Sequence, residues 1–283
     1  MRAVLLLILF YVQFISSHGQ GSIQKRGTGW VQIEQYFTRS DSYFNSVSER
    51  ISIRTNALYM TSLSSEYGIT NRITAIIIFP FFARSTVNEL EYNQTGNTES
   101  GTSLNSLGDT DVGLRFSIRQ KFPVQVNGFI TFGLPFGKKG SVGTETDVQT
   151  GDGELNQISG IELRHYFLSL KLTASGYVAF NNRAKNFSNE VRYGFGIGYK
   201  ADRLFVAARL SVIESLFNDT APVSLNSIFS NHRELVSPGV EVDYRITNKI
   251  SLLATGTFVV SGRNTLAAPA WTFGIKSPVN ILP

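Results

Sequence analysis

The chain has 283 residues, a formal net charge of +5, 42% hydrophobic residues and only 17% charged residues, below the roughly 25% usual in soluble domains. This composition excludes a disordered chain, a collagen and a coiled coil, and the absence of cysteine excludes thiolate metal sites and cysteine nucleophiles. No run of Lys or Arg exceeds two residues, so nucleic-acid binding, which needs basic tracts or helices, is not expected.

The amino-terminal residues have the pattern of an export signal. Arg2 precedes an apolar run over residues 3–15, and small residues then fit a cleavage site before Gln20. A membrane anchor helix is the alternative, but about 13 apolar residues are short for a span, which needs about 20. We predict a cleaved signal over residues 1–19 and a mature barrel domain over residues 20–283.

No later segment has 18 consecutive apolar residues, so no transmembrane helix is expected after the signal. Two classes of exported protein remain, a secreted soluble β-protein and a β-barrel of the bacterial outer membrane. The pattern of the strands distinguishes them.

From about residue 28 onward, polar and apolar residues alternate with a period of two, which predicts strands. The alternation is weaker in some strands, and the segment 73–82 is apolar on both faces. The predicted strands are 28–38, 50–68, 73–86, 109–119, 125–137, 153–166, 168–182, 189–201, 203–216, 234–247, 250–263 and 267–279. They are longer than the usual globular strand of about 5–6 residues and match the roughly 9–11 residues of a strand that crosses a bilayer.

The connections between these strands alternate in length. Tight turns are expected at 70–72, 121–123, 201–203 and 247–249, and long polar segments at 39–49, 87–108, 138–152, 183–188 and 217–233. This alternation is typical of outer-membrane barrels. An even number of strands then predicts both termini on the periplasmic side and the long loops outside the cell.

The two faces of the strands differ in chemistry. A soluble barrel turns its apolar face inward. Here the polar face is rich in glycine and in charges of both signs, as a crowded interior requires, and the apolar face carries aromatic residues near strand ends, similar to the aromatic girdles of membrane barrels. We therefore predict an all-β transmembrane up-and-down antiparallel barrel of about twelve strands whose apolar face contacts outer-membrane lipid.

The polar face supplies the candidates for a solute path. These are Glu34, Arg54, Asp109, Asp111, Arg115, Arg119, Glu162, Arg164, Lys171, Arg192, Arg209, Glu241, Asp243, Arg245 and Lys276. Bases outnumber acids in this set, which predicts a preference for anionic solutes if the lumen is open. Twelve strands lie between the small filled barrels of 8 and the porins of 16–18, so an open lumen would be narrow.

Five short motifs occur in order at 66–73, 79–81, 107–115, 133–137 and 151–154. Their order and spacing resemble a family of outer-membrane barrels named after the meta pathway of phenol degradation, described as outer-membrane transporters. The resemblance implies transport of hydrophobic or aromatic compounds. Residues 20–27 are too few for the amino-terminal plug that such transporters often have. Within the motifs, Pro80 and Pro135 predict interrupted or bulged pairing, because proline donates no ladder hydrogen bond.

Catalytic and metal sites are not expected. His18 lies in the signal, and neither His165 nor His232 has a serine and an acid at the spacing of a catalytic relay. The paired acids Asp109 and Asp111 share their face with arginines, which favours charge pairing inside a lumen over acid catalysis or metal binding. No cofactor-binding motif is present.

The leading hypothesis is therefore a channel or transporter in the outer membrane for small solutes, anionic or aromatic in character. Its other expected partners are membrane lipid and, during biogenesis, the barrel-assembly machinery. The alternative is a closed structural or adhesive barrel that displays its outer loops, the largest of which are 87–108 and 217–233. An enzyme built on the barrel is disfavoured.

Overall fold

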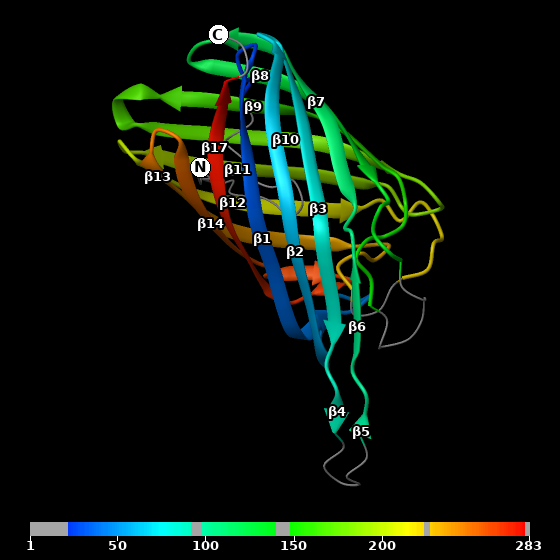
Figure 1. Ribbon diagram of the computed structural model, residues 1–283. Helices are drawn as coiled ribbons and strands as arrows, with labels where there is room; N and C mark the ends of the chain where they lie inside the picture. Colours follow the sequence, from blue (N-terminus) through cyan, green and yellow to red (C-terminus); the bar gives the residue numbers. More distant parts are fainter. Residues whose placement is uncertain (1–21, 92–97, 140–147, 224–226, 281–283) are drawn as a thin grey trace, which may run out of the picture.

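The computed structural model describes residues 22–91, 98–139, 148–223 and 227–280. Twelve long antiparallel strands form a closed up-and-down barrel in which the first strand pairs with the last, as predicted (Figure 1). Within the described residues, no helix is long and apolar enough to cross a membrane. The export signal expected over residues 1–19 lies outside them.

The strands of the wall begin within four residues of the predicted positions. They are β1 (Thr28–Phe44), β2 (Arg50–Thr70), β3 (Ile73–Val87), β7 (Thr110–Lys121), β8 (Val124–Leu134), β9 (Asn156–Phe167), β10 (Leu172–Arg183), β11 (Glu190–Lys200), β12 (Leu204–Ser215), β13 (Glu234–Thr247), β14 (Ile250–Phe258) and β17 (Pro269–Asn280). Short strands extend the long-loop end, namely β4 (Leu90–Glu91), β5 (Thr98–Glu99), β6 (Thr102–Ser106), β15 (Ser261–Arg263) and β16 (Thr265–Leu266).

The barrel buries its polar face and exposes its apolar face. On β7, Arg115 is 6% exposed, whereas its neighbours Leu114 and Phe116 are 41% and 44% exposed. The same contrast holds on β1 and β17, where Glu34 is buried while Ile33 and Ile275 are exposed. This is the reverse of a soluble barrel and is the arrangement that a lipid-facing wall requires.

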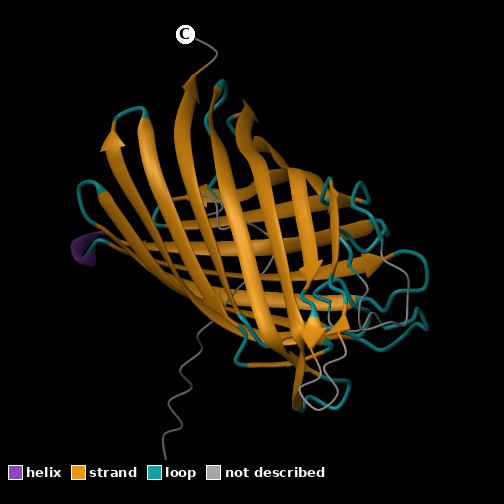
Figure 2. Cartoon of the chain, turned by 60° about the horizontal axis from the view of Figure 1, so that its bottom comes forward, coloured by secondary structure: helices purple, strands orange, loops and turns teal. Residues whose placement is uncertain are grey.

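The two ends of the barrel differ, as expected. Tight turns at 71–72, 122–123 and 248–249 lie at one end, where Thr28 of β1 also pairs with Asn280 of β17. The long loops gather at the other end, opposite the short 3-10 turn η1 (Leu168–Leu170), which is drawn purple (Figure 2). The hairpin of β4 and β5 projects from this long-loop end (Figure 1).

Three predicted strands need correction. The strand expected over 28–38 continues to Phe44, so most of the loop expected over 39–49 is strand and only residues 45–49 connect β1 to β2. The strand expected over 250–263 ends at Phe258, and residues 259–268 form a sixth connection at the long-loop end in which β15 pairs with β13 and β16 with β1. The strand expected from residue 168 begins at Leu172, because residues 168–170 form η1 and Lys171 has the left-handed φ of 53°.

The prolines interrupt pairing as predicted. The ladder between β2 and β3 shifts register next to Pro80, and β3 leaves β7 after Ile78 and pairs with β6 from Ala83 onward. Strand β8 ends at Leu134, directly before Pro135. A proline has no amide hydrogen for the ladder, so β3 changes its partner near Pro80 and β8 ends before Pro135.

Candidate functional site

A cavity of about 190 Å³ lies inside the barrel. At roughly 15 Å³ per water it has room for about a dozen water molecules. Its wall includes Glu34 of β1, Asp111 of β7, Arg192 of β11 and Arg209 of β12, and its roof consists of loop residues at 150–152 and 228–233. The cavity is therefore bounded by strands from around the barrel and by loops that enter its mouth.

The roof segments contain fully buried residues, among them Thr150 and Asn231, and are bonded to one another. The side-chain oxygen of Asn231 accepts a hydrogen bond from the Ser188 amide (2.9 Å), and its side-chain nitrogen donates to the Ala221 carbonyl (2.6 Å). The side chain of Gln149 donates to Ser227, which joins the loop over 135–155 to the loop over 216–233. The long loops thus close much of the mouth from within.

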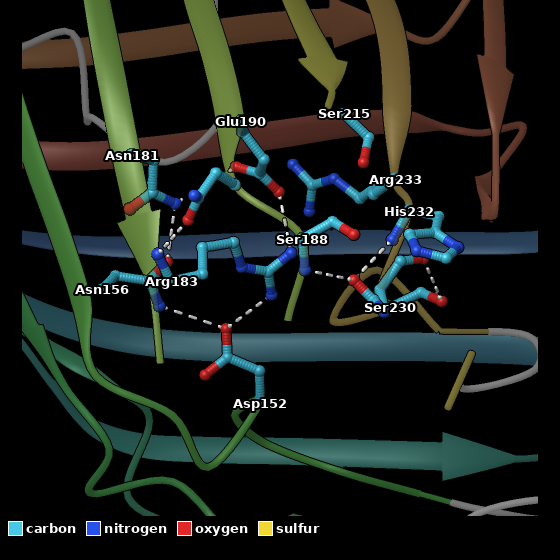
Figure 3. A network of polar contacts seen from close by, with 12 residues as sticks. Asp152, Asn156, Asn181, Arg183, Ser188, Glu190, Ser215, Ser230, His232 and Arg233 are labelled. Atoms are coloured by element: carbon cyan, nitrogen blue, oxygen red, sulfur yellow. Dashed lines mark hydrogen bonds and ion pairs between the residues drawn. The ribbon is translucent and has the colours of Figure 1, made fainter. Parts of the chain in front are cut away.

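One arginine holds the charged part of the roof against the wall. The guanidinium of Arg183 donates to Glu190 (2.9 Å), to Asp152 (3.4 Å) and to Glu154, and Glu190 also accepts from Arg192 (2.8 Å) (Figure 3). A planar guanidinium presents five donors, which allows it to hold three carboxylates at once. The network joins β10 and β11 to the loop over 135–155.

Asp109 fixes the same loop by a different contact. Its two carboxylate oxygens accept hydrogen bonds from the amides of Gly137 and Asp152, both at 2.9 Å, and the Gly108 amide donates to the Pro80 carbonyl. A Cβ at Gly151 would lie 2.2 Å from the Asp109 carboxylate, so only glycine fits there. Four of the five motifs that carry the family resemblance meet at this point.

The carboxyl group of Asp109 is desolvated. Burial, and next the charge of Asp152, raise the pKa of Asp109 from 3.8 to about 7. Between about pH 4 and pH 7, Asp109 therefore keeps its proton when the loop is docked and releases it when the loop is undocked. Docking of the loop is coupled to pH in this range.

Raising the pH from about 5 to about 8 is expected to loosen the loop over 135–155. The pKa of Asp109 is raised in the docked state, so protonated Asp109 stabilises docking fully below about pH 4. This contribution declines as the pH rises to about 7 and is lost above that pH. Hydrogen exchange of the Gly137 and Asp152 amides, corrected for intrinsic rates, measures the change. Asp109→Asn should weaken the pH dependence, and the remainder is assigned to Glu154 of the same loop, whose pKa burial raises to about 8. Constant protection in the unchanged protein would contradict the coupling.

A second charged network lies nearer the short-turn end. Arg115 of β7 bridges Glu66 of β2 (2.7 Å) and Glu162 of β9 (2.8 Å) across the inside of the wall. On the other side of the barrel, Arg209 pairs with Glu241 (2.6 Å) and Lys276 with Asp243. Glu34 accepts from Ser64 (3.0 Å) and Gln32 (2.8 Å).

The short-turn mouth is narrowed by the first described residues. The Gln24 amide donates to the Thr74 hydroxyl (2.8 Å), and its side chain donates to Glu66 (3.3 Å). A Cβ at Gly68 would lie 2.1 Å from the Lys25 carbonyl oxygen, so the chain crosses directly over this glycine. The segment before β1 thus reaches the barrel interior through Gln24.

Most of the predicted site residues lie together inside the barrel, namely Glu34, Asp109, Asp111, Arg115, Glu162, Arg164, Arg192, Arg209, Glu241, Asp243 and Lys276. Arg164 is buried beside the hydroxyl of Tyr166, at 3.4 Å.

The other four predicted residues lie elsewhere. Arg119 follows a bulge after Ser117 that turns it to the apolar face, where it pairs with Val126. Lys171 is exposed in the turn after η1, and Arg245 is exposed at the rim, where it donates to the Asp202 carbonyl (2.7 Å). Arg54 binds Glu99 (2.7 Å) of the projecting hairpin.

The structure adds interior charges that the predicted set did not include, namely Glu66, Asp152, Glu154, Arg183, Glu190 and Arg233. Glu66 and Glu190 follow the alternation of β2 and β11 and were detectable; Arg183 ends β10, and the other three lie on loops, where no period applies. The interior charges of the described chain are then ten acids, Glu34, Glu66, Asp109, Asp111, Asp152, Glu154, Glu162, Glu190, Glu241 and Asp243, and seven bases, Arg115, Arg164, Arg183, Arg192, Arg209, Arg233 and Lys276. The expected excess of bases is reversed.

The two histidines of the described chain lie away from the cavity lining. The ring nitrogen Nε2 of His232 lies 2.9 Å from the Asp219 carbonyl oxygen, and the ring of His165 packs 4.3 Å from that of Phe167. Both contacts are structural.

No protein-family model and no curated protein sequence matches this chain. Solved structures are similar in fold. An outer-membrane channel from Pseudomonas putida F1 has a TM-score of 0.64 at 13% identity, with 92% of this chain and 98% of that chain covered. The NanC porin has a TM-score of 0.54 at 11% identity, with 87% and 98% covered. The translocator domain of the autotransporter NalP from Neisseria meningitidis has a TM-score of 0.50 at 11% identity, with 90% and 89% covered. The chain has the fold of the bacterial outer-membrane β-barrels.

Proposed function

We propose that this protein is a narrow channel of the bacterial outer membrane for small solutes, with its long loops outside the cell and both termini in the periplasm. The observation that carries the proposal is a cavity lined by both charged and apolar side chains, enclosed by a barrel whose outer wall is apolar. An apolar band around a polar interior suits a protein that stands in lipid and admits water-soluble molecules. Membrane lipid and the barrel-assembly machinery are the proposed partners.

We also propose that the chain belongs to the transporter family that its motifs resemble. The support is local: motif residues at 80, 108–109, 137 and 151–152 meet around the Asp109 carboxylate. Because these motifs meet in one contact, they fix the position of the loop at the long-loop mouth. Related channels would share the shape of this mouth. The residues elsewhere in the barrel give less support for this family, because many different side chains are compatible with a strand that alternates polar and apolar residues.

A closed barrel that displays its loops is the second candidate. It is favoured by the buried roof, in which Thr150 and Asn231 are fully inaccessible. The two candidates differ in whether this roof yields to permeating solute. No energy-coupling site is required in either case, since both act without a driven step.

Single-channel recording of the full mature protein in a planar bilayer tests the channel. In recordings at about pH 9, where the interior acids are charged, we expect small discrete conductance steps and, across a salt gradient, a reversal potential that indicates preference for cations, because ten acids then face seven bases inside. Asp111→Asn should reduce this preference. Glu214→Gln, which alters an acid bonded to Tyr193 outside the cavity lining, is the matched control. Silence from a barrel that shows heat-modifiable migration supports the closed alternative.

A further inference from the structure

We propose that the cavity binds a small organic anion with an apolar body, whose carboxylate pairs with Arg233. This inference deepens the proposed channel function, and rests on it for the route by which the anion enters. The preference for cations follows from the net charge of the whole interior, whereas anion binding depends on the local charge of Arg233. It depends on three features of the cavity: a guanidinium with spare donors, an apolar wall beside it, and acids that are already engaged.

Arg233 is a buried cation without a carboxylate partner in the described chain. It lies at the end of the roof segment, directly before β13, lines the cavity and is 8% exposed. Its guanidinium donates to the Ile228 carbonyl, and its Nε has no hydrogen-bond partner. Figure 3 shows the side chain of Arg233 beside the Arg183 network, with no ion pair drawn to it. A guanidinium that is taken out of water without an anionic partner is left incompletely solvated, which favours the binding of an added anion.

The other arginines of the cavity are paired. Arg183 contacts three carboxylates, Arg192 contacts Glu190 and Arg209 contacts Glu241. Burial lowers the pKa of Arg233 to about 10, an effect larger than the opposing charge of Glu190. Arg233 is therefore the guanidinium with the greatest capacity for an added anion.

The cavity is apolar on the side of β2 and β3. Met60, Ile78 and Pro80 line it from the wall, and Ile228 and Phe229 line it from the roof. Met60 and Ile228 belong to one buried apolar cluster, against which Phe229 packs. This explains why the segment 73–82 is apolar on both faces, since Ile78 and Pro80 face the cavity while their neighbours face lipid. An apolar body on this wall places its carboxylate near the roof.

The acids that line the cavity leave Arg233 available to an added anion. Asp152 and Glu190 bind Arg183, and Glu34 accepts from Gln32 and Ser64. Asp109 accepts two backbone amides, and Asp111 lies within electrostatic reach of Arg192. A planar carboxylate matches the fork of a guanidinium with two parallel hydrogen bonds, which favours this anion over a spherical one.

Titration calorimetry of the full mature protein in detergent tests the site with three probes. Benzoate has both the carboxylate and the apolar body, benzyl alcohol lacks the charge, and acetate lacks the body. We expect benzoate to bind at least about tenfold more tightly than either. Arg233→Gln should weaken benzoate at least about tenfold and leave benzyl alcohol unchanged. Arg263→Gln, at an arginine paired with Glu234 outside the cavity lining, is the matched control.

Unchanged benzoate affinity in Arg233→Gln, or benzyl alcohol binding as tightly as benzoate, would overturn the site. If that variant does not fold, Arg233→Lys retains the charge without the planar fork and should weaken benzoate several-fold; undiminished affinity there overturns it equally. Binding in detergent needs no conduction. A barrel that binds benzoate but is silent in bilayers refutes the channel alone, and one that conducts without binding refutes the site alone.

Discussion

Replacing Arg183 by methionine is expected to lower the free energy of unfolding by about 3–5 kcal/mol and to open the long-loop mouth. The Arg183 side chain is 4% exposed and pairs with Asp152, Glu154 and Glu190. Its loss leaves three buried carboxylates that repel one another, and the roof relieves this repulsion by moving into water. Denaturant unfolding in micelles, followed by the fluorescence of Trp30 and Trp271, measures the stability, and single-channel conductance measures the opening.

The matched control for this change is Arg84→Met. Arg84 is exposed on β3 and donates to Asn105 (3.3 Å), a contact that contributes little because both groups are solvated. We expect its stability and conductance to match the unchanged protein. A loss below about 1 kcal/mol in Arg183→Met, together with unchanged conductance, would show that the roof does not depend on this network.

The wall of the barrel was predictable because it obeys a local rule. A strand with lipid on one side and polar groups on the other alternates with period two, so Glu34, Arg115 and Glu241 are identified from their neighbours alone. The rule fails where the backbone departs from the regular pleat. The bulge between Ser117 and Arg119 inserts one residue and reverses the faces beyond it, and nothing in the alternation of 109–119 indicates this.

The roof of the cavity was not predictable for a different reason. Polar loop segments such as 148–155 and 227–233 have the composition of solvated loops, yet their side chains are buried by contacts between residues far apart in the chain. Arg233 finds its surroundings only when β13 closes beside β12. A loop is rich in polar residues because its backbone groups need hydrogen-bond partners. The composition alone does not show whether those partners are water molecules or side chains inside the barrel.

These two failures together explain the reversed charge balance. Bases assigned to the interior by alternation, such as Arg119 and Lys171, leave it through a bulge and a turn. Acids that alternation could not assign, such as Asp152 and Glu154, enter it on a loop. The selectivity of the proposed channel therefore depends on the irregular parts of the chain more than on its strands.

Replacing Arg115 by methionine is expected to cost about 3–5 kcal/mol of stability and to strengthen the preference for cations. Arg115 joins Glu66 on β2 to Glu162 on β9, and both carboxylates are left without their cation when it is removed. The interior then has one positive charge fewer near the short-turn mouth. Denaturant unfolding in micelles and the reversal potential across a salt gradient measure the two effects.

Arg119→Met is the control for this experiment, because it tests whether the effect depends on the inward position of the arginine. A strict alternation places Arg115 and Arg119 on the same inner face, so both substitutions would then alter selectivity. The bulge places Arg119 outside, exposed and opposite Val126, so its substitution should leave stability within about 0.5 kcal/mol and the reversal potential unchanged. Equal effects from the two variants would mean that the strand continues without the bulge and that the charge balance derived from it is wrong.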